Sequence, residues 1–125
     1  MVKSLISIII SFLILVCAAC YEQIYLKNTF DEMQDKLAVV EEKLDNKTAV
    51  KEDILVLQEY WIHKKESLHI FVPHNDIKEI ELWISEAVIY TEMKDYDEAR
   101  SKIAVVIDLT NQIPKYYMIR WKNIL

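Results

Sequence analysis

The chain has 125 residues, a formal net charge of −5 and no glycine. Its length allows a single domain, and the acidic balance argues against nucleic-acid binding, which needs clustered Lys and Arg for phosphate contacts. Without glycine the chain lacks the usual source of positive φ angles, so glycine-rich phosphate-binding loops are excluded and tight β-hairpins are disfavoured. Long stretches of Glu, Lys, Leu, Ile and Ala favour helix. The composition therefore predicts an all-α protein.

The N-terminal stretch 4–21 is apolar and holds no charged residue, and it is bounded by Lys3 and Glu22. A helix of this length extends roughly 27 Å, close to the hydrocarbon thickness of a bilayer. A basic residue before the stretch and acidic residues after it favour a cytoplasmic N-terminus. We therefore expect a membrane anchor or uncleaved signal over residues 1–21 and an extracytoplasmic helical domain over residues 22–125.

Both cysteines, Cys17 and Cys20, lie in the apolar stretch, so the domain after it has no disulfide framework. A zinc site would need four ligands, and these two thiols are surrounded by apolar residues. Ala18 and Ala19 before Cys20 also resemble a lipoprotein processing site, although such sites usually have leucine where Cys17 stands. A lipoprotein anchored at Cys20 and a cleaved, released domain remain open as alternatives to the anchor.

From Leu26 to Leu44 the apolar residues recur every three or four positions, which predicts one face of a helix. No helix breaker separates this stretch from the anchor, so we expect one helix from about residue 4 to 45. After a turn at 45–48, a second helix is expected to start near Thr48 and to end before Pro73. Its apolar stripe is expected to contain Val50, Ile54, Leu57, Trp61, Leu68 and Phe71.

Two further helices follow from capping patterns and apolar periodicity. Asp76 with Glu79 predicts a capping box for a third helix, and Asp95 with Glu98 predicts one for a fourth. Pro114 is expected to end the fourth helix, which leaves a short fifth helix after it. Short connections predict antiparallel neighbours. The expected fold is an N-terminal transmembrane helix that continues into a small bundle of two antiparallel helical hairpins plus a short C-terminal helix, with Trp61 and Trp83 in the core.

Candidate catalytic groups are scattered along the chain. His63, His69 and His74 are spaced six and five residues apart, so they do not share one helix face. The serines lie in predicted helices, without the sharp turn that exposes a nucleophile. We therefore expect no enzymatic activity, no cofactor and no metal.

The C-terminal segment 115–125 contains three basic residues, three aromatic residues and no acidic residue. Such a composition suits an interfacial or partner-docking helix, because basic and aromatic side chains bind anionic headgroups. The alternative is a helix that closes the bundle core, since short amphipathic helices are usually held by packing. The candidate interaction surface consists of Tyr116, Tyr117, Arg120, Trp121 and Lys122.

Several short motifs occur in a fixed order along the whole chain. They are a Lys-Ser-Leu-Ile start, the apolar anchor, a leucine-rich amphipathic helix, Trp61, the His74-Asn75-Asp76-Ile77 turn, the Lys94-Asp95 turn, Ile113-Pro114 and an Asn123-Ile124-Leu125 ending. In this order of features the chain resembles an uncharacterised family of short, single-span membrane-anchored helical proteins of clostridia-like bacteria. The resemblance implies a single span and an outward helical domain, and it implies no activity.

These features favour a non-catalytic, membrane-tethered interaction or adaptor module that acts on another cell-envelope protein. The alternative is an extracytoplasmic solute- or lipid-binding helical domain. An enclosed apolar cavity with converging polar groups would favour the alternative, whereas a filled core with an exposed apolar groove would favour the adaptor. Because the turn at 45–48 is short, the second helix can cover the stripe from Leu26 to Leu44 at little cost in loop entropy. The soluble domain is therefore expected to be a monomer.

Overall fold

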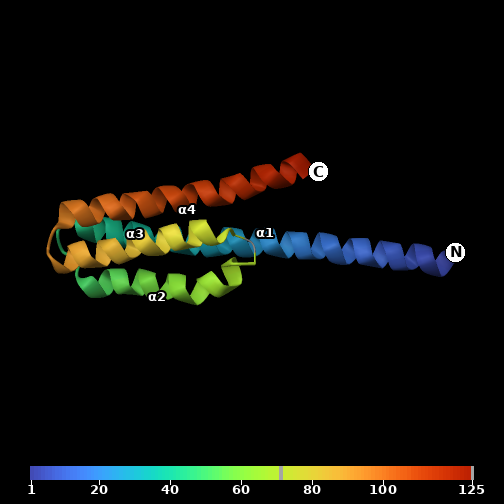
Figure 1. Cartoon of the computed structure of the whole chain (residues 1–125), viewed down its shortest axis with the longest axis horizontal. Coiled ribbons are helices and arrows are strands. Elements are labelled where there is room, and N and C mark those ends of the chain that lie inside the picture. Colours follow the sequence, from blue (N-terminus) through green and yellow to red (C-terminus); the bar gives the residue numbers. More distant parts are fainter. Residues whose placement is uncertain (71, 125) are drawn as a thin grey trace.

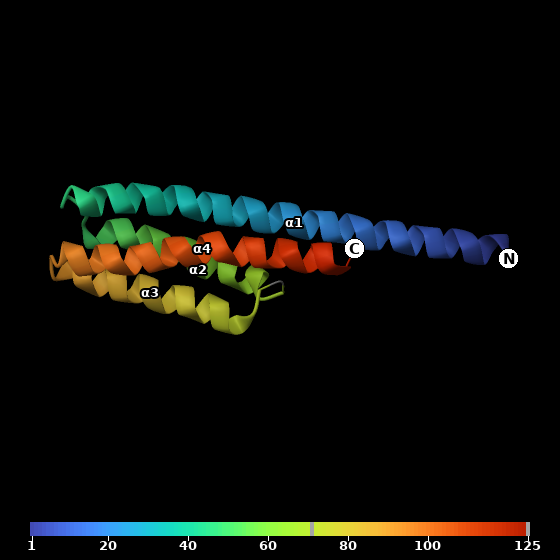
Figure 2. The ribbon, with the colours of Figure 1, turned by 90° about the horizontal axis from the view of Figure 1, so that it is seen from above.

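The computed structural model describes residues 1–70 and 72–124, and from Tyr116 onward it describes the backbone only. It contains four helices: α1 (Val2–Asp45), α2 (Lys51–Leu68), α3 (His74–Glu92) and α4 (Tyr96–Ile124). Successive helices run antiparallel, and α1 and α3 each pack against both α2 and α4 (Figures 1 and 2). The N-terminal part of α1 projects from this four-helix bundle (Figure 1). The expected all-α fold with two helical hairpins is confirmed.

Helix α1 is continuous through the boundary between the apolar stretch and the bundle, as the absence of a breaker predicts. Residues 1–18 are exposed, and within the described part of the chain α1 is the helix that is long and apolar enough to cross a membrane. The remainder of α1 buries one face, with the period expected for an amphipathic helix. That face consists of Leu26, Thr29, Phe30, Met33, Leu37, Val40 and Leu44.

The chain leaves α1 through a Schellman motif in which a lysine takes the usual place of glycine. Lys47 has a φ angle of 57°. Its N–H donates to the carbonyl of Leu44 over 3.1 Å, and the N–H of Thr48 donates to the carbonyl of Lys43 over 2.8 Å. Thr48 therefore completes the end of α1, and the prediction that α2 starts near Thr48 is wrong.

Helix α2 begins at Lys51, three residues later than expected. Val50 precedes it in an extended conformation and is 53% exposed, so Val50 does not belong to the buried stripe. The Asp53 carboxylate accepts hydrogen bonds from the N–H of Val50 over 2.9 Å and from Lys43 over 2.8 Å. The hydrogen bond from Lys43 is the main reason that the pKa of Asp53 lies below its usual value. Phe71, the last expected member of the stripe, lies outside the described residues.

Helix α3 begins at His74, directly after Pro73, whose carbonyl accepts hydrogen bonds from the N–H groups of Asp76 and Ile77. Asp76 therefore lies in the first turn, where a carboxylate suits the helix dipole, and the expected capping box with Glu79 is wrong. Helix α3 ends in a second Schellman motif, with Lys94 at a φ angle of 61°. Asp95 Oδ1 then accepts the N–H of Glu98 over 3.4 Å, as half of a capping box.

Helix α4 runs through Pro114 to Ile124, so the predictions that Pro114 ends a helix and that a short fifth helix follows are wrong. Proline removes the N–H that would bond the carbonyl of Thr110. A donor from another helix takes its place, because Gln34 Nε2 on α1 lies 3.4 Å from that carbonyl. The side chain of Asn111 accepts a hydrogen bond from the same amide.

The core fills the space between the four helices, and Trp61 is its largest side chain, at 1% exposure. Trp83 is only partly buried, so the prediction that it is a core residue is wrong. Ile80, Ile84 and Ala87 occupy the centre of the buried face of α3, and Trp83 lies to one side of it, with Lys102 Nζ 5.0 Å from the ring centre.

Candidate functional site

The candidate surface at residues 116–122 lies on the last turns of α4. The side chains of Tyr116, Tyr117, Arg120, Trp121 and Lys122 lie outside the described part of the structure. Neither the docking surface nor the alternative of core closure is tested, and both remain predictions. The backbone nevertheless places this segment relative to α1.

Contacts between α1 and α4 fix the antiparallel register of the two helices. Arg100 forms ion pairs with Glu41 over 2.9 Å and with Asp45 over 3.0 Å. Ten residues later, the carbonyl of Thr110 lies beside Gln34. Since both helices rise by about 1.5 Å per residue, Ile124 comes level with roughly residue 20 of α1. The last turns of α4 therefore come level with the end of the apolar stretch, although α4 diverges from α1 toward its C-terminus (Figure 1).

Helix α2 runs antiparallel to α1, as α4 does, and reaches the same level. Tyr60 donates its hydroxyl to the carbonyl of Thr29 over 3.1 Å, and Lys64 Nζ lies 5.7 Å from the ring centre of Tyr25. One further turn brings the end of α2 level with Tyr21. Figures 1 and 2 show the α2–α3 connection and the C-terminal end of α4 at the end of the bundle from which α1 projects. We call this end the base and define it as the described residues of the ranges 20–27, 64–79 and 117–124.

Aromatic and basic side chains meet where α1 and α2 approach the base. The rings of Tyr21 and Tyr25 stack at 6.2 Å, and Lys64 lies over the rings of both Tyr25 and Tyr60. The Tyr60 hydroxyl also donates to the Glu32 carboxylate over 2.7 Å. Burial, and then this carboxylate, raise the pKa of Tyr60, so the phenol remains a neutral donor that ties α2 to α1.

The α2–α3 connection brings together two histidines, His69 and His74, whose spacing does not place them on one helix face. The rings of His69 and His74 stack with their centres 5.0 Å apart, and both side chains are exposed. Between them Ile70 is 77% exposed. His63 lies apart from this pair on the exposed side of α2. Among the described residues no group of three or more His, Cys, Asp and Glu side chains is arranged to hold a metal ion.

The charges are unevenly distributed between the base and the rest of the chain. The three ranges of the base contain six basic and four acidic residues, whereas the remaining residues contain nine basic and sixteen acidic ones. The base is thus net positive in a chain whose net charge is −5. The chain as a whole is acidic, so this local excess of basic residues is apparent only once the helix register places the three ranges at one end of the bundle.

A second notable surface lies on the side of α3 that faces away from the bundle. Leu82, Ile89 and Met93 are 56%, 55% and 67% exposed. Spacings of seven and four residues place them on one helix face, which we call the outer α3 stripe. Apolar periodicity on the buried face of α3 gives no indication of this second row of apolar residues.

The hollows on the surface are shallow and open to solvent. One lies over α4 and is lined by Ala104, Val105, Ile107, Asp108, Leu109 and Asn111. Another lies beside the first turns of α1, from Met1 to Ile8. The core itself is packed with residues that are at most 6% exposed. A pocket for a solute usually encloses most of its ligand, and neither of these hollows does.

A family model described as "Domain of unknown function (DUF4363)" matches residues 20–124. The match begins where the apolar stretch ends and includes nearly the whole bundle. No curated protein and no solved structure matches the chain. The predicted membership of an uncharacterised family is confirmed, while the expected bacterial source and the single membrane span remain predictions. Because the family model matches most of its length, the chain belongs to the DUF4363 family.

Proposed function

We propose that the protein is a non-catalytic, membrane-tethered interaction module that positions another protein of the cell envelope at the outer face of the membrane. In this proposal the apolar part of α1 spans the membrane with the N-terminus inside, and the bundle lies outside the cytoplasm. The length and apolar character of α1 support the span. The single basic residue before the apolar stretch, against Glu22, Asp31 and Glu32 after it, supports the orientation.

The outer α3 stripe is the observation that carries the proposal. Its three apolar side chains are more than half exposed, although the opposite face of α3 packs into the core. A row of apolar residues with helical spacing fits an amphipathic helix of a partner, which would cover the row with its own apolar face. The occupant that we propose is such a helix from another membrane protein.

Membrane tethering allows a surface as small as the outer α3 stripe to bind a partner protein. Two proteins held in one membrane lose less translational freedom on binding than two proteins in solution. The alternative function, solute or lipid binding within the bundle, requires an enclosed cavity. The open hollows on the described surface and the packed core support the adaptor over that alternative.

Site-specific photocrosslinking in native membranes tests the proposal. A photoreactive amino acid would replace Leu82 or Ile89, and Val56 on α2 provides the matched control because it is 54% exposed, against 56% for Leu82. We expect one crosslinked protein from positions 82 and 89 and none from position 56. That product should disappear when Ile89→Asp is added to the variant labelled at position 82, while circular dichroism stays unchanged. Equal labelling at all three positions, or a product that survives Ile89→Asp, would contradict the proposal.

A further inference from the structure

We propose that the base of the bundle is a second membrane contact, in which the α2–α3 connection with Ile70 lies in the headgroup layer of the bilayer that holds α1. The partner of this surface is the lipid bilayer itself. The inference requires that α1 is inserted in the membrane. It does not require the protein partner proposed for the outer α3 stripe.

The thickness of the headgroup layer determines which residues of α1 lie at the membrane surface. Each polar layer adds about 5–7 Å to the hydrocarbon core, which corresponds to about three to five residues of a helix perpendicular to the membrane. Tyr21 is the last residue of the uncharged stretch. The headgroup layer therefore surrounds approximately residues 22–26 of α1.

Helix α2 reaches the level of this headgroup layer. Lys64 lies over the ring of Tyr25, inside this layer, and α2 continues for another turn to Leu68. Because α1 is one unbroken helix, no flexible linker separates the bundle from the apolar stretch. The α2–α3 connection must therefore come into contact with the bilayer surface when α1 is inserted. A tilt of α1 toward α2 would bring the connection deeper.

The side chains at the base also suit a bilayer surface. Ile70 is 77% exposed and would lose contact with water among the upper acyl chains. Tyr21 and Tyr25 have the amphipathic rings that concentrate at membrane interfaces. By sequence the base contains six basic and four acidic residues in an acidic chain, and Arg120 and Lys122 supply the excess, so its composition suits anionic headgroups.

The inference is specific to an inserted α1. A lipoprotein processed before Cys20 would lack residues 1–19, so no inserted helix would fix the height of the bundle above the bilayer. A domain that was cleaved and released would make no such contact in its isolated form.

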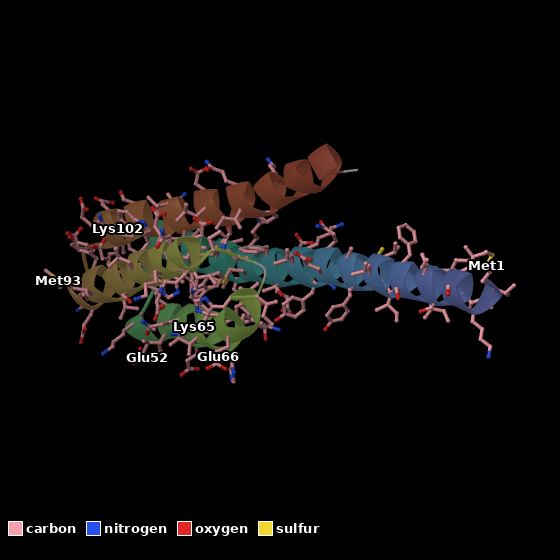
Figure 3. All side chains as sticks on the ribbon, turned by 45° about the vertical axis from the view of Figure 1, so that its right-hand side comes forward. Met1, Glu52, Lys65, Glu66, Met93 and Lys102 are labelled. Carbon is pink, nitrogen blue, oxygen red and sulfur yellow. The ribbon has the colours of Figure 1, made fainter. Side chains whose placement is uncertain are left out.

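Fluorescence quenching by lipid measures the contact directly. The full chain, with Cys17→Ala and Cys20→Ala, would carry one new cysteine labelled with an environment-sensitive dye, either Ile70→Cys or Met93→Cys. Met93 is a matched control because it is 67% exposed and also follows a helix. Figure 3 shows Met93 at the end of the protein opposite Met1, whereas Lys65 and Glu66 of α2 lie nearer to the projecting part of α1.

The labelled proteins would be reconstituted in vesicles of phosphatidylcholine and phosphatidylglycerol that contain a lipid with a spin label on its headgroup. We expect the dye at position 70 to be quenched at least threefold more strongly than the dye at position 93, with its emission shifted to the blue. Equal quenching at the two positions would overturn the inference. Failure of crosslinking at the outer α3 stripe would leave this result unaffected, because the two experiments probe different surfaces.

Amide hydrogen exchange of the unmodified full chain provides a second measurement that needs no variant. In nanodiscs, exchange in the segment 69–75 should be several-fold slower than in detergent micelles. Residues 93–95, in the connection at the other end, should exchange at the same rate in both. Equal exchange of segment 69–75 in the two environments would contradict the inference.

Discussion

The indole N–H of Trp61 on α2 donates a buried hydrogen bond to the carbonyl of Ile77 on α3 over 3.3 Å. The ring of Trp61 also contacts Phe30 on α1, with the ring centres 6.3 Å apart. One side chain therefore joins three of the four helices near the centre of the core.

We predict that Trp61→Ala lowers the free energy of unfolding by about 3–5 kcal/mol, because it removes a large buried side chain and leaves a cavity. Trp83→Ala should cost only about 1–2 kcal/mol, since Trp83 is partly exposed. Urea denaturation of residues 22–125 would measure both values. Equal losses for the two variants would show that the difference in burial has no energetic consequence.

The hydrogen bond from Gln34 to the carbonyl of Thr110 should depend on Pro114. We expect Gln34→Ala to destabilise the bundle by about 1 kcal/mol, because the carbonyl then has no donor from either helix. Pro114→Ala would supply an N–H within α4, so Gln34→Ala should cost less in that background. A double-mutant cycle in urea measures this coupling, and purely additive losses would contradict it.

The two Schellman motifs predict sites where glycine stabilises the protein. Lys47 and Lys94 have φ angles of 57° and 61°, a region that glycine adopts without steric cost. Each of Lys47→Gly and Lys94→Gly should therefore raise the free energy of unfolding by up to about 1 kcal/mol. Lys78→Gly, within α3, is the control and should lower it by about 1 kcal/mol. Thermal unfolding would compare the three variants.

The lowered pKa of Asp53 predicts that stability depends on pH. The pKa of its carboxyl group is lower in the folded protein than in the unfolded chain, so its contribution is present above about pH 4 and is lost as the pH falls further. Asp53→Asn should therefore destabilise the protein at neutral pH, by about 1 kcal/mol or less because Lys43 is 43% exposed. The difference from the unmodified protein should shrink below pH 4 in urea titrations. A difference that stays constant down to pH 2 would contradict this assignment.

The proposed orientation predicts the sensitivity of the domain to protease. Protease added to intact protoplasts should degrade the bundle, because the proposed orientation places the domain outside the cytoplasm. Survival of the full-length chain in intact protoplasts, together with its digestion after lysis, would reverse the orientation.

Apolar periodicity was sufficient to predict α1, because the apolar stripe has no interruption. All six of its apolar residues are buried: Leu26, Phe30, Met33, Leu37, Val40 and Leu44. Pro114 was misjudged because the compensating donor, Gln34, is 76 residues away from Thr110 in the chain. The late start of α2 depends on the positive φ angle of Lys47, which a sequence without glycine does not signal.

The candidate site was harder to predict from the sequence than the fold was. His69 and His74 meet only because the chain turns between two helices, and their spacing of five residues indicates no contact within one helix. The net positive charge at the base likewise depends on three ranges that the helix register brings together. Local patterns thus identified the helices, whereas the surfaces depended on contacts between distant parts of the chain.

Because α1 is one unbroken helix, the number of residues between the apolar stretch and the bundle determines the direction in which the bundle faces. Each residue added between the apolar stretch and Leu26 would rotate the bundle by about 100° around the axis of α1 and raise it by about 1.5 Å. One inserted residue would therefore turn the outer α3 stripe away from a neighbour in the same membrane. Insertion of a whole turn would nearly restore the original direction but would lift the base by about 5 Å. If α1 spans the membrane as proposed, the number of residues between membrane and bundle therefore sets the angle at which the bundle faces its neighbours, whereas a domain on a flexible stalk can rotate freely.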